Sequence, residues 1–342
     1  MSIRLIEKTE AGVALERSEA EALMEELLAG RLDTPTIVRL LTALNARPYR
    51  AAELAAFARV MRRHAARVFA EGETPPANIV DTCGTGGDGA QTFNISTAAA
   101  IVAAAAGARV AKHGNRAASS LSGSADVLEA LGVRIDLPFL KTGKAIREIG
   151  IGFLFAQAAH TATHHAMPAR KQIGVRTVFN LLGPLTNPAG AQSHVLGVFS
   201  AGVLDLVAET LLELGTERAM VIHGAGGLDE ISLSGQTKIA EVKDGRILRC
   251  EVTPEEFGMK RAPVEEIRGG TAADNAALIR RIFDGEPGAP ADIVAVNAGA
   301  ALLVTGVAKT LREGAEIAGE AVKSGTTKRK LEEMVKYGSR QG

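Results

Sequence analysis

The feature that most constrains the fold is a strand, a glycine-rich loop and a helix that follow one another from residue 79. Ile79-Val80-Asp81 is a short apolar segment typical of a buried strand, and the glycines of residues 84–89 come directly after it. A helix is expected from about Ser96 to Ala106, and Arg109-Val110-Ala111 is the next strand. Strands joined through a helix lie parallel in one sheet, because the crossover brings the chain back to the same end.

The same alternation continues through most of the chain. Helices are expected over Ser124–Leu131 and, in an apolar segment, over Ile293–Val304. Further strands are expected at Val133–Ile135, Phe153–Phe155, His194–Phe199 and Ala219–Ile222, and a hairpin at Asp244-Gly245 joins Ile239–Val242 to Arg246–Leu248. The fold class is therefore α/β, with a mostly parallel sheet that is flanked by helices on both faces.

The first seventy or so residues show only helical patterns. Ser18-Glu19-Ala20-Glu21 indicates a capping box at the start of a helix that ends at Gly30. Asp33 and Pro35 mark the start of a second helix, and a third is expected over Ala51–Arg67. Residues 71–76 break this pattern. We therefore expect a small helical domain over residues 1–72, joined by a segment near residues 165–190, and a larger α/β domain over residues 73–342.

Charge and composition argue against several classes of protein. The chain has 342 residues, and 39 Lys and Arg balance 39 Asp and Glu. A formally neutral chain is a poor candidate for general nucleic-acid binding, which needs a basic surface. Cys83 and Cys250 make neither a disulfide framework nor a zinc site. The N-terminus has no apolar signal region, and no apolar run is long enough to span a membrane, so a soluble cytoplasmic protein is expected.

The glycine-rich loop itself fits more than one function. Gly84-Thr85-Gly86-Gly87-Asp88-Gly89 matches the G-x-G-x-x-G pattern of dinucleotide-binding folds, which place an acid about twenty residues later to hold the ribose hydroxyls. Here that region is Lys112-His113-Gly114-Asn115-Arg116, and its two cations favour phosphate charge. No Lys-Ser or Lys-Thr pair follows the last glycine, so the loop is not a Walker A motif either.

An anion-binding loop is the interpretation that fits these residues. Glycines let successive backbone N–H groups turn toward one point, and a helix starting near Asn94 adds the positive end of its dipole. The alternative is a tight turn that needs glycine for steric reasons only. The polar residues around the loop favour the first interpretation, which predicts a bound phosphate or pyrophosphate.

A second glycine-rich loop, residues 224–230, ends in two adjacent acids, Asp229 and Glu230. On an irregular loop both can reach one hard cation, and Mg²⁺ prefers one or two carboxylates together with the oxygens of a phosphate substrate. An ordinary solvated acidic turn would contain the same residues. The pair therefore indicates a magnesium site only in combination with the glycine-rich loop at residues 84–89.

Several separate segments, in the same order along the chain, resemble the anthranilate phosphoribosyltransferase family. They are Asp81–Asp88, Thr92–Thr97, Lys112–Arg116, Ser119-Ser120, Gly123–Asp126, Arg176–Pro188 and Leu228–Ser232. The resemblance covers most of the chain, and the order of helical segment, loop and α/β body agrees with it.

This resemblance implies a reaction, a cofactor and an assembly. Members of the family transfer the phosphoribosyl group of phosphoribosyl pyrophosphate to the amine of anthranilate and release pyrophosphate, in tryptophan biosynthesis. Magnesium is implied as the cofactor, with two ions expected beside the donor pyrophosphate. A homodimer built largely through the helical domain is also implied. Neither nucleic acid nor a membrane is expected as a partner.

The resemblance also implies roles for single residues. Catalytic roles fall to Lys112, Asn115, His160 and Arg170, and anthranilate is expected to contact Gly84, Asn115 and Arg170. A guanidinium suits this role because it can hold a carboxylate through two hydrogen bonds. Ser96, Asp229 and Glu230 are the expected Mg²⁺ ligands. The expected donor contacts are Gly84, Gly87, Asp88, Thr92, Asn94, Ile95, Ser96, Thr97, Lys112, His113, Gly114, Asn115, Arg116, Ala117, Ala118, Ser119, Ser120 and Ser124.

One stretch departs from the family pattern. Family members commonly carry a His-Pro-Ala-Met-Lys type sequence before the acceptor arginine, and His160-Thr161-Ala162-Thr163-His164 stands there in this chain. The bulky position is Thr163. The departure concerns the wall of the aromatic acceptor pocket and leaves the donor site untouched.

The expected mechanism is direct displacement at the anomeric carbon of the ribose through an oxocarbenium-like state. It needs stabilisation of the charge on the leaving pyrophosphate and positioning of a weakly nucleophilic arylamine. No covalent intermediate is required, so Cys83 is expected to be a small structural residue. His113 is expected to make a loop-structuring hydrogen bond, and His160 to line the acceptor pocket.

Two other functions stay open at this point. The first is a related transferase, or a nucleoside phosphorylase, with another acceptor; the segment Lys112–Asn115 differs from the Lys-Met-Ser-Gly type segment of the phosphorylases. The second is a non-catalytic relative that binds nucleic acid. Neutral net charge and the Asp229-Glu230 pair argue against the second.

Overall fold

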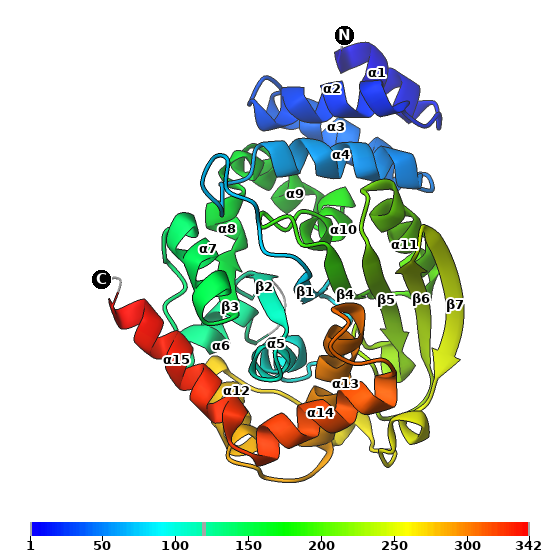
Figure 1. Cartoon of the computed structure of the whole chain (residues 1–342). Coiled ribbons are helices and arrows are strands. Elements are labelled where there is room, and N and C mark those ends of the chain that lie inside the picture. Colours follow the sequence, from blue (N-terminus) through cyan, green and yellow to red (C-terminus); the bar gives the residue numbers. More distant parts are fainter. Residues whose placement is uncertain (1, 118–120, 341–342) are drawn as a thin grey trace.

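Four helices occupy the N-terminal part of the computed structural model, which describes residues 2–117 and 121–340 (Figure 1). They are α1 (Ser2–Glu10), α2 (Arg17–Leu28), α3 (Thr34–Asn45) and α4 (Ala51–Arg63). The start of α3 is as predicted, since the Asp33 carboxylate accepts from the Thr36 N–H at 3.0 Å. This group of helices, called the helical bundle below, confirms the helical N-terminal domain.

Two predicted helix ends in the bundle were wrong. The cap of α2 is Glu16 and not Ser18, because the Glu19 carboxylate accepts from the Glu16 N–H at 2.9 Å and Ser18 already lies within the helix. Helix α4 stops at Arg63 and does not reach Arg67. The chain leaves it there because the Ala66 N–H donates to the carbonyl of Ala159 in the larger domain.

A seven-stranded sheet is the centre of the larger domain in the part of the chain that the structure describes. Its spatial order is β3-β2-β1-β4-β5-β6-β7, with β1–β5 parallel and β6 and β7 antiparallel. The predicted hairpin is confirmed, since Asp244 and Gly245 have φ of 52° and 70°, as a two-residue turn between twisted strands requires. The strands are β1 (Ile79–Gly84), β2 (Arg109–Gly114), β3 (Ile151–Phe155), β4 (Ser193–Gly197), β5 (Arg218–Gly224), β6 (Thr237–Lys243) and β7 (Arg246–Val252).

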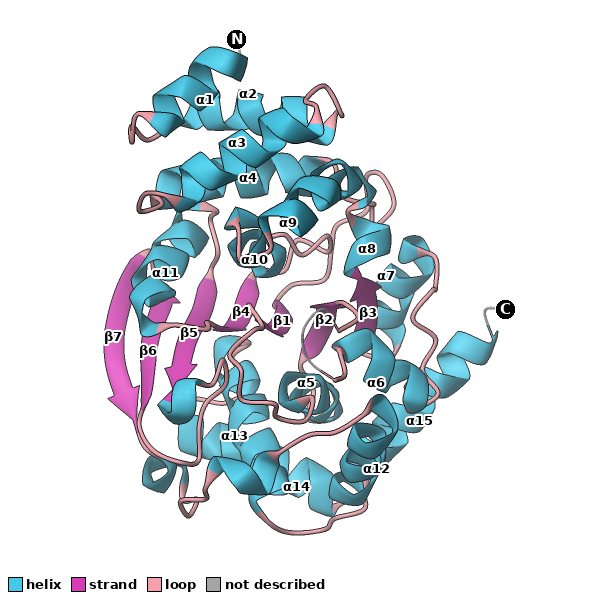
Figure 2. Cartoon of the chain, turned by 180° about the vertical axis from the view of Figure 1, so that it is seen from behind, coloured by secondary structure: helices cyan, strands magenta, loops and turns pink. Residues whose placement is uncertain are grey.

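Helices cover both faces of this sheet (Figures 1 and 2). α5 and α13 pack on one face, and α7 and α11 pack on the other. Among the described residues no helix combines the length and the apolar character that crossing a membrane requires. The helices of this domain are α5 (Ile95–Ala105), α6 (Ser124–Ala130), α7 (Phe139–Glu148), α8 (Ala156–Ala159), α9 (Met167–Ile173), α10 (Val178–Leu182), α11 (Leu204–Glu213), α12 (Ala272–Phe283), α13 (Ala289–Val304), α14 (Leu311–Lys323) and α15 (Thr326–Arg340).

The sheet separates two hydrophobic cores. Side chains alternate along a strand, so Val195 faces the core that contains α5 and α13, whereas Leu196 faces the other. The core of Leu196 also contains Leu54 and Phe57 of the helical bundle. The bundle thus shares its core with one face of the sheet.

The segment between β3 and β4 makes the contacts between the bundle and the sheet. α9 packs against α3, and α10 packs against α4. These contacts support a division into residues 1–72, with a joining segment near residues 165–190, and residues 73–342. The division itself stays a prediction.

The strand predicted at Val133–Ile135 was wrong. Gly132 has a φ of 88°, and the Val133 N–H turns back to the carbonyl of Leu128 at 2.9 Å at the end of α6. The segment therefore closes a helix and pairs with no strand. Its two β-branched side chains are buried in the core, which is why their pattern resembles that of a strand.

Candidate active site

The candidate site lies at the strand where the order of the sheet changes direction, which is β1. β1 has β2 on one side and β4 on the other. The chain adds β2 and then β3 on the first side of β1, and it then crosses over to add β4 and β5 on the second side. A crevice opens at such a point outside the carboxyl ends of parallel strands, and ligands of α/β proteins bind there. The glycine-rich loop follows β1 at this position.

Two glycines at this point make room for Asp229. Gly84 ends β1 and pairs in register with Gly197, which ends β4. A Cβ on Gly84 would lie 2.2 Å from the Asp229 carboxylate, and a Cβ on Gly197 would lie 1.6 Å from the Asp229 carbonyl oxygen. The loop that follows β5 therefore passes directly over the ends of β1 and β4.

Asp229 contacts the glycine-rich loop directly, and Glu230 contacts the start of the helix that follows the loop. The Gly86 N–H donates to the Asp229 carboxylate at 2.9 Å, and the Ser96 N–H at the start of α5 donates to Glu230 at 3.0 Å. The Asp229 N–H lies 3.5 Å from the Asp88 carboxylate. Three acidic residues are thereby gathered around the loop.

Asp229 and Glu230 are held in an environment that disfavours their charge. Burial, and next the charge of Asp88, raise the pKa of Asp229 to about 7. Burial, and next the charge of Asp229, raise the pKa of Glu230 well above its usual value. Among the described residues no ion pair neutralises any of the three acids. A divalent cation would remove this repulsion, so the donor set fits Mg²⁺.

The acids alone do not form a complete metal site. No group of three or more His, Cys, Asp or Glu side chains is arranged to hold a metal within residues 2–117 and 121–340. Mg²⁺ commonly takes one or two carboxylates and completes its shell with water and phosphate oxygens. Asp229 and Glu230 could supply the first part. The Ser96 hydroxyl, the third predicted ligand, belongs to the residue whose N–H already holds Glu230.

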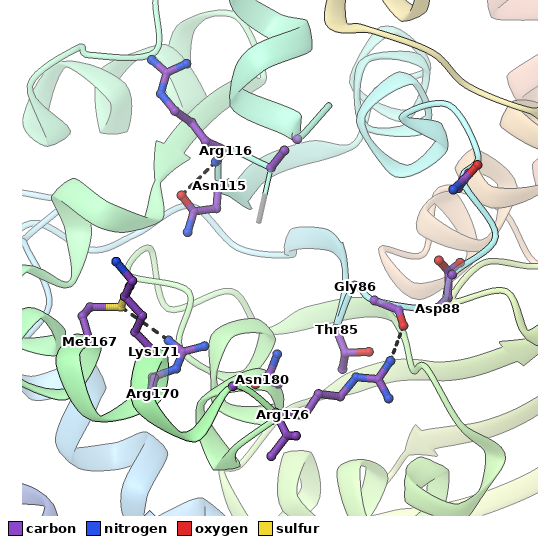
Figure 3. Close-up of a pocket in the computed structure, with 18 of the residues that line it drawn as sticks. Thr85, Gly86, Asp88, Asn115, Arg116, Met167, Arg170, Lys171, Arg176 and Asn180 are labelled. Carbon is purple, nitrogen blue, oxygen red and sulfur yellow. Dashed lines mark hydrogen bonds between the residues drawn. The ribbon is translucent and has the colours of Figure 1, made fainter. Parts of the chain in front are cut away.

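An open cleft of about 1670 Å³ lies beside the loop. Seven of the predicted site residues line it: Gly84, Gly87, Asp88, Asn115, Arg116, Ala117 and Arg170. Figure 3 shows Asn115 and Arg116 on one side of the cleft and Arg170 and Arg176 on the other. Ala118, Ser119 and Ser120 lie outside the described residues.

Arg170 is the cation on the wall opposite Asn115. It comes from α9, and its guanidinium lies 5.3 Å from the centre of the Phe179 ring and 3.9 Å from Met167 Sδ. Burial lowers the pKa of Arg170. Arg170 makes no ion pair with another described residue, so the planar guanidinium is available to a carboxylate at the face of an apolar wall.

Lys112 and Arg116, the two cations predicted beside the loop, are both engaged. Lys112 is only 4% exposed and does not line the cleft, and its ammonium donates to the Thr82 carbonyl. Arg116 lines the cleft, but its guanidinium pairs with Asp126 at 2.9 Å and with Glu129. Neither cation presents a free charge to the cleft.

Two predicted site histidines form a buried pair. The rings of His113 and His160 meet edge to face with centres 5.2 Å apart, and neither Nε2 has a hydrogen-bond partner among the described residues. Burial lowers the pKa of His113 to about 3 and that of His160 to about 4, so both are neutral at physiological pH. Burial also raises the pKa of the Cys83 thiol, which fits a structural residue.

The remaining predicted donor residues lie next to the cleft without lining it. Ile95 and Thr97 are buried in the first turn of α5. The Asn94 amide bonds to Ser122 and Asn275, and the Ser124 hydroxyl accepts from the Asn115 N–H at 3.0 Å. Thr92 forms an isolated antiparallel β-bridge with Arg268. Gly114 ends β2, and a Cβ there would collide with the Ser124 side chain. These residues shape the two loops that the cleft contains.

The cleft also contains residues to which sequence reasoning gave no role. Arg176 is the most prominent, since it donates to the Gly87 carbonyl and stacks on Phe199 with its guanidinium 4.2 Å from the ring centre. It opens the segment Arg176–Pro188 that carries the family resemblance, and this was the one signal in the sequence. The others without a predicted role are Gln91, Gly123, His164, Met167, Pro168, Lys171, Gly174, Val175 and Asn180, whereas Thr85, Gly86 and Gly89 belong to the predicted anion-binding loop.

Family models match both parts of the chain. The helical bundle domain of the glycosyl transferase family matches residues 3–65, and the a/b domain of that family matches residues 76–328. An anthranilate phosphoribosyltransferase of Nitrosospira multiformis is 48% identical over 99% of this chain and 95% of its own length. The chain belongs to the anthranilate phosphoribosyltransferase family. Another member, from Symbiobacterium thermophilum, is 47% identical over 97% of this chain and 96% of its own length.

Solved structures of the family agree with this assignment. The anthranilate phosphoribosyltransferase of Thermus thermophilus superposes with a TM-score of 0.92 at 48% identity and covers 97% of this chain and 98% of its own. The enzyme of Saccharomyces cerevisiae in complex with PRPP and Mg superposes with a TM-score of 0.88 at 26% identity, over 99% of this chain and 98% of its own. Family membership favours the anthranilate enzyme over the two alternative functions that the sequence left open.

Proposed function

We propose that this protein transfers the phosphoribosyl group of phosphoribosyl pyrophosphate to the amine of anthranilate, with release of pyrophosphate, as a step of tryptophan biosynthesis. The observation that carries the proposal is the pairing of two sites across one cleft. The glycine-rich loop and its acids suit a pyrophosphate with Mg²⁺, and Arg170 opposite, which has no ion pair among the described residues, suits an aromatic carboxylate.

The donor side of the cleft stabilises the leaving group. In the reaction the bond from the anomeric carbon to pyrophosphate breaks, so negative charge grows on the pyrophosphate oxygens. Backbone N–H groups of Gly87 and Asp88 and the positive end of α5 favour that charge. Asp229 and Glu230 would hold two Mg²⁺ ions, which, when bound, neutralise the pyrophosphate. We include Ser96 as a further ligand through its hydroxyl.

The acceptor side positions the amine. Arg170 would hold the anthranilate carboxylate, and Asn115 on the facing wall would orient the ring from the other side. Met167 and Val175, which also line the cleft, supply apolar surface beside Arg170. They would take the place of the bulky residue that the family has where this chain has Thr163.

Lys112 and His160 act from behind the cleft in this proposal. The buried ammonium of Lys112 lies close enough to Glu230 and Asp81 to favour their charged forms. His160 is neutral and has an unpartnered Nε2 within the described structure, so it has hydrogen-bonding capacity left for a further partner. Neither residue needs to act as a strong base, because the amine loses its proton as the C–N bond forms.

A fluorescence assay tests the proposed reaction. Anthranilate fluorescence should fall only when enzyme, phosphoribosyl pyrophosphate and Mg²⁺ are all present, and EDTA should stop the reaction. Persistent anthranilate at high enzyme concentration, with another aminobenzoate consumed, would overturn the choice of acceptor. Inactivity with every acceptor, together with no calorimetric binding of the donor, would overturn the proposal altogether.

The proposal includes a homodimer and a cytoplasmic location. Ile3 and Val13 on the helical bundle are 61% and 49% exposed, and large exposed apolar side chains on the bundle suit contact with a second copy. The free thiols of Cys83 and Cys250 suit a reducing compartment. Light scattering should give twice the mass of the chain. The double variant Ile3→Asp, Val13→Asp should halve this measured mass.

A further inference from the structure

A continuous chain of hydrogen bonds runs from the helical bundle to the glycine-rich loop. The Tyr49 hydroxyl donates to the Asn45 side chain at 2.6 Å, and the Asn45 side-chain amide donates to the Arg176 carbonyl at 2.7 Å. The Arg176 guanidinium then donates to the Gly87 carbonyl. Asn45 is the last residue of α3, so the bundle touches the proposed donor loop through Arg176.

Arg176 contacts the glycine-rich loop at a second point. Its guanidinium lies over the Phe199 ring with 4.2 Å between the guanidinium carbon and the ring centre, a close cation–π geometry. The Phe199 N–H in turn donates to the Thr85 hydroxyl at 2.9 Å. Arg176 therefore fixes both the start of the loop, through Phe199, and its middle, through Gly87.

The bond to Gly87 controls the direction of a peptide group. Gly87 has a φ of 72°, a conformation that glycine adopts without strain and leaves easily. In a trans peptide the carbonyl and the N–H of the next residue point in opposite directions. Fixing the Gly87 carbonyl on Arg176 therefore also fixes the Asp88 N–H, one of the donors that an anion-binding loop needs.

The bundle end of the hydrogen-bond chain lies beside a buried ion pair. Arg47 and Glu53 flank Tyr49 in sequence and form a buried bidentate ion pair, and Glu53 also accepts from the Leu15 N–H at 3.1 Å. Burial raises the pKa of Tyr49 to about 12, so its hydroxyl stays protonated and donates to Asn45 at every physiological pH. A firm anchor is what a positioning contact requires.

We propose that Arg176 is a positioning residue for the phosphoribosyl donor and that Asn45 and Tyr49 hold it in place from the helical bundle. Donor affinity then depends on residues of the first fifty that never touch the donor. This inference rests on the proposed function, because it assigns the ligand of the loop. Arg176 suits the role better than a lysine would, since only a planar guanidinium can stack on Phe199 and donate to Gly87 together.

Three variants test the proposal: Arg176→Met, Asn45→Ala and their combination. Arg176→Met should weaken donor binding roughly 10- to 100-fold by calorimetry with Mg²⁺, as expected for a lost charge-assisted hydrogen bond, and Asn45→Ala about three- to tenfold. The KM for anthranilate and kcat should stay within about twofold. The double variant should bind the donor no more weakly than Arg176→Met, because members of one chain do not add.

Two further variants and two controls complete the test. Arg176→Lys should lose nearly as much donor affinity as Arg176→Met, and Tyr49→Phe should resemble Asn45→Ala. Thr42→Ala, an exposed hydroxyl on the same helix α3, and Arg249→Met, an exposed arginine paired with Asp205, should leave donor affinity unchanged. Melting temperatures show whether each variant is folded.

Amide hydrogen exchange gives a readout that does not depend on the ligand. In the ligand-free protein, peptides covering residues 84–92 should exchange about tenfold faster in Asn45→Ala and Arg176→Met than in the unchanged protein. The proposal is overturned if the two single effects multiply in the double variant, or if Asn45→Ala lowers kcat and leaves donor affinity and loop exchange as they were. If the unchanged protein binds no donor, the proposed function fails, and the exchange result still decides whether Arg176 holds the loop.

Discussion

At the scale of single residues, Asp229 lies at the centre of the site. Its backbone passes over Gly197, its carboxylate reaches the Gly86 N–H, and Asp88 lies on its other side. Without a cation the charged form of this carboxylate lowers the stability of the folded protein, because burial and a neighbouring acid both oppose its charge. Its charge is therefore useful only when a ligand compensates it.

The pH dependence of stability should report this directly. A raised pKa in the folded protein means that folding favours the protonated acid, so stability falls as pH rises from about 4 to about 7 and stays low above that. Asp229→Asn should therefore raise the melting temperature of the ligand-free protein by about 2 °C at pH 8 and not at pH 4. The same substitution should also lower turnover about 100-fold and raise the Mg²⁺ concentration needed for half-maximal activity. An equal melting temperature at pH 8, or an unchanged Mg²⁺ titration, would contradict the assignment.

The two glycines under Asp229 should differ when a methyl group is added. In Gly84→Ala the methyl meets a side-chain carboxylate that can rotate away, so the protein should fold but lose most donor binding. In Gly197→Ala it meets a backbone carbonyl, so unfolding free energy should drop by about 3 kcal/mol or more. Gly319→Ala, an open position within helix α14, should be neutral or stabilising by about 0.5–1 kcal/mol. Urea denaturation and donor calorimetry separate these outcomes.

Sequence reasoning identified the residue types of the site well and their orientation less well. Glycines before a helix and a remote pair of acids predicted an anion site with a metal, because those chemical properties belong to the residues themselves. Whether Lys112 points into the cleft or behind it depends on the tertiary structure, and in the structure it bonds to the Thr82 carbonyl. Arg176 was missed because its role arises from a contact with Gly87, 89 residues earlier in the chain.

At the scale of elements, the two halves of the cleft come from different places. The proposed donor side is formed by loops after β1, β2 and β5, whereas Arg170, the proposed acceptor arginine, comes from α9, which packs on α3 of the bundle. Small movements of the bundle relative to the sheet would change the distance between the two substrates.

The elements themselves were predictable from the sequence where apolar periodicity was regular. Val133–Ile135 was wrong because buried β-branched residues in a helix-ending turn have the same pattern as a strand.

This separation predicts a split in kinetic constants. Arg170→Lys keeps the charge and loses the bidentate geometry, so the KM for anthranilate should rise roughly 10- to 100-fold while the KM for phosphoribosyl pyrophosphate changes less than about twofold. Steady-state kinetics with each substrate varied in turn measures both constants. Arg249→Lys is the matched control, since this exposed arginine pairs with Asp205 outside the cleft. A rise in both Michaelis constants would place Arg170 in the donor site as well.

At the scale of the whole molecule, the bundle and the sheet share one hydrophobic core. Leu54 and Phe57 of α4 belong to the same buried cluster as Leu196 and Val221 of the sheet. A boundary near residue 72 is visible in the sequence as a change of pattern. The shared core is not visible there, because it depends on how α9, α10 and α11 fill the space between the two parts.

The shared core predicts that the chain unfolds as one unit. The full chain should show a single thermal transition with the same midpoint by circular dichroism and by tyrosine fluorescence. A fragment of residues 1–72 should be less helical than α1–α4 are in the whole protein and should melt without a cooperative transition, because it lacks one side of its core. A fragment that melts cooperatively would show that the bundle folds by itself.

The pairing of β1 with β4 also has a consequence for the growing chain during synthesis. Val80 of β1 pairs with Ser193 of β4, 113 residues later, so β1 leaves the ribosome long before its neighbour on that side exists. Until then its open edge can pair with other chains, which makes this stage the one most exposed to aggregation. Asp229 and Glu230 emerge later still. The nascent protein therefore carries the proposed donor loop without the two acids that are proposed to bind its metal. On this proposal, the donor with its metal can stabilise only a chain that has been completed past β5.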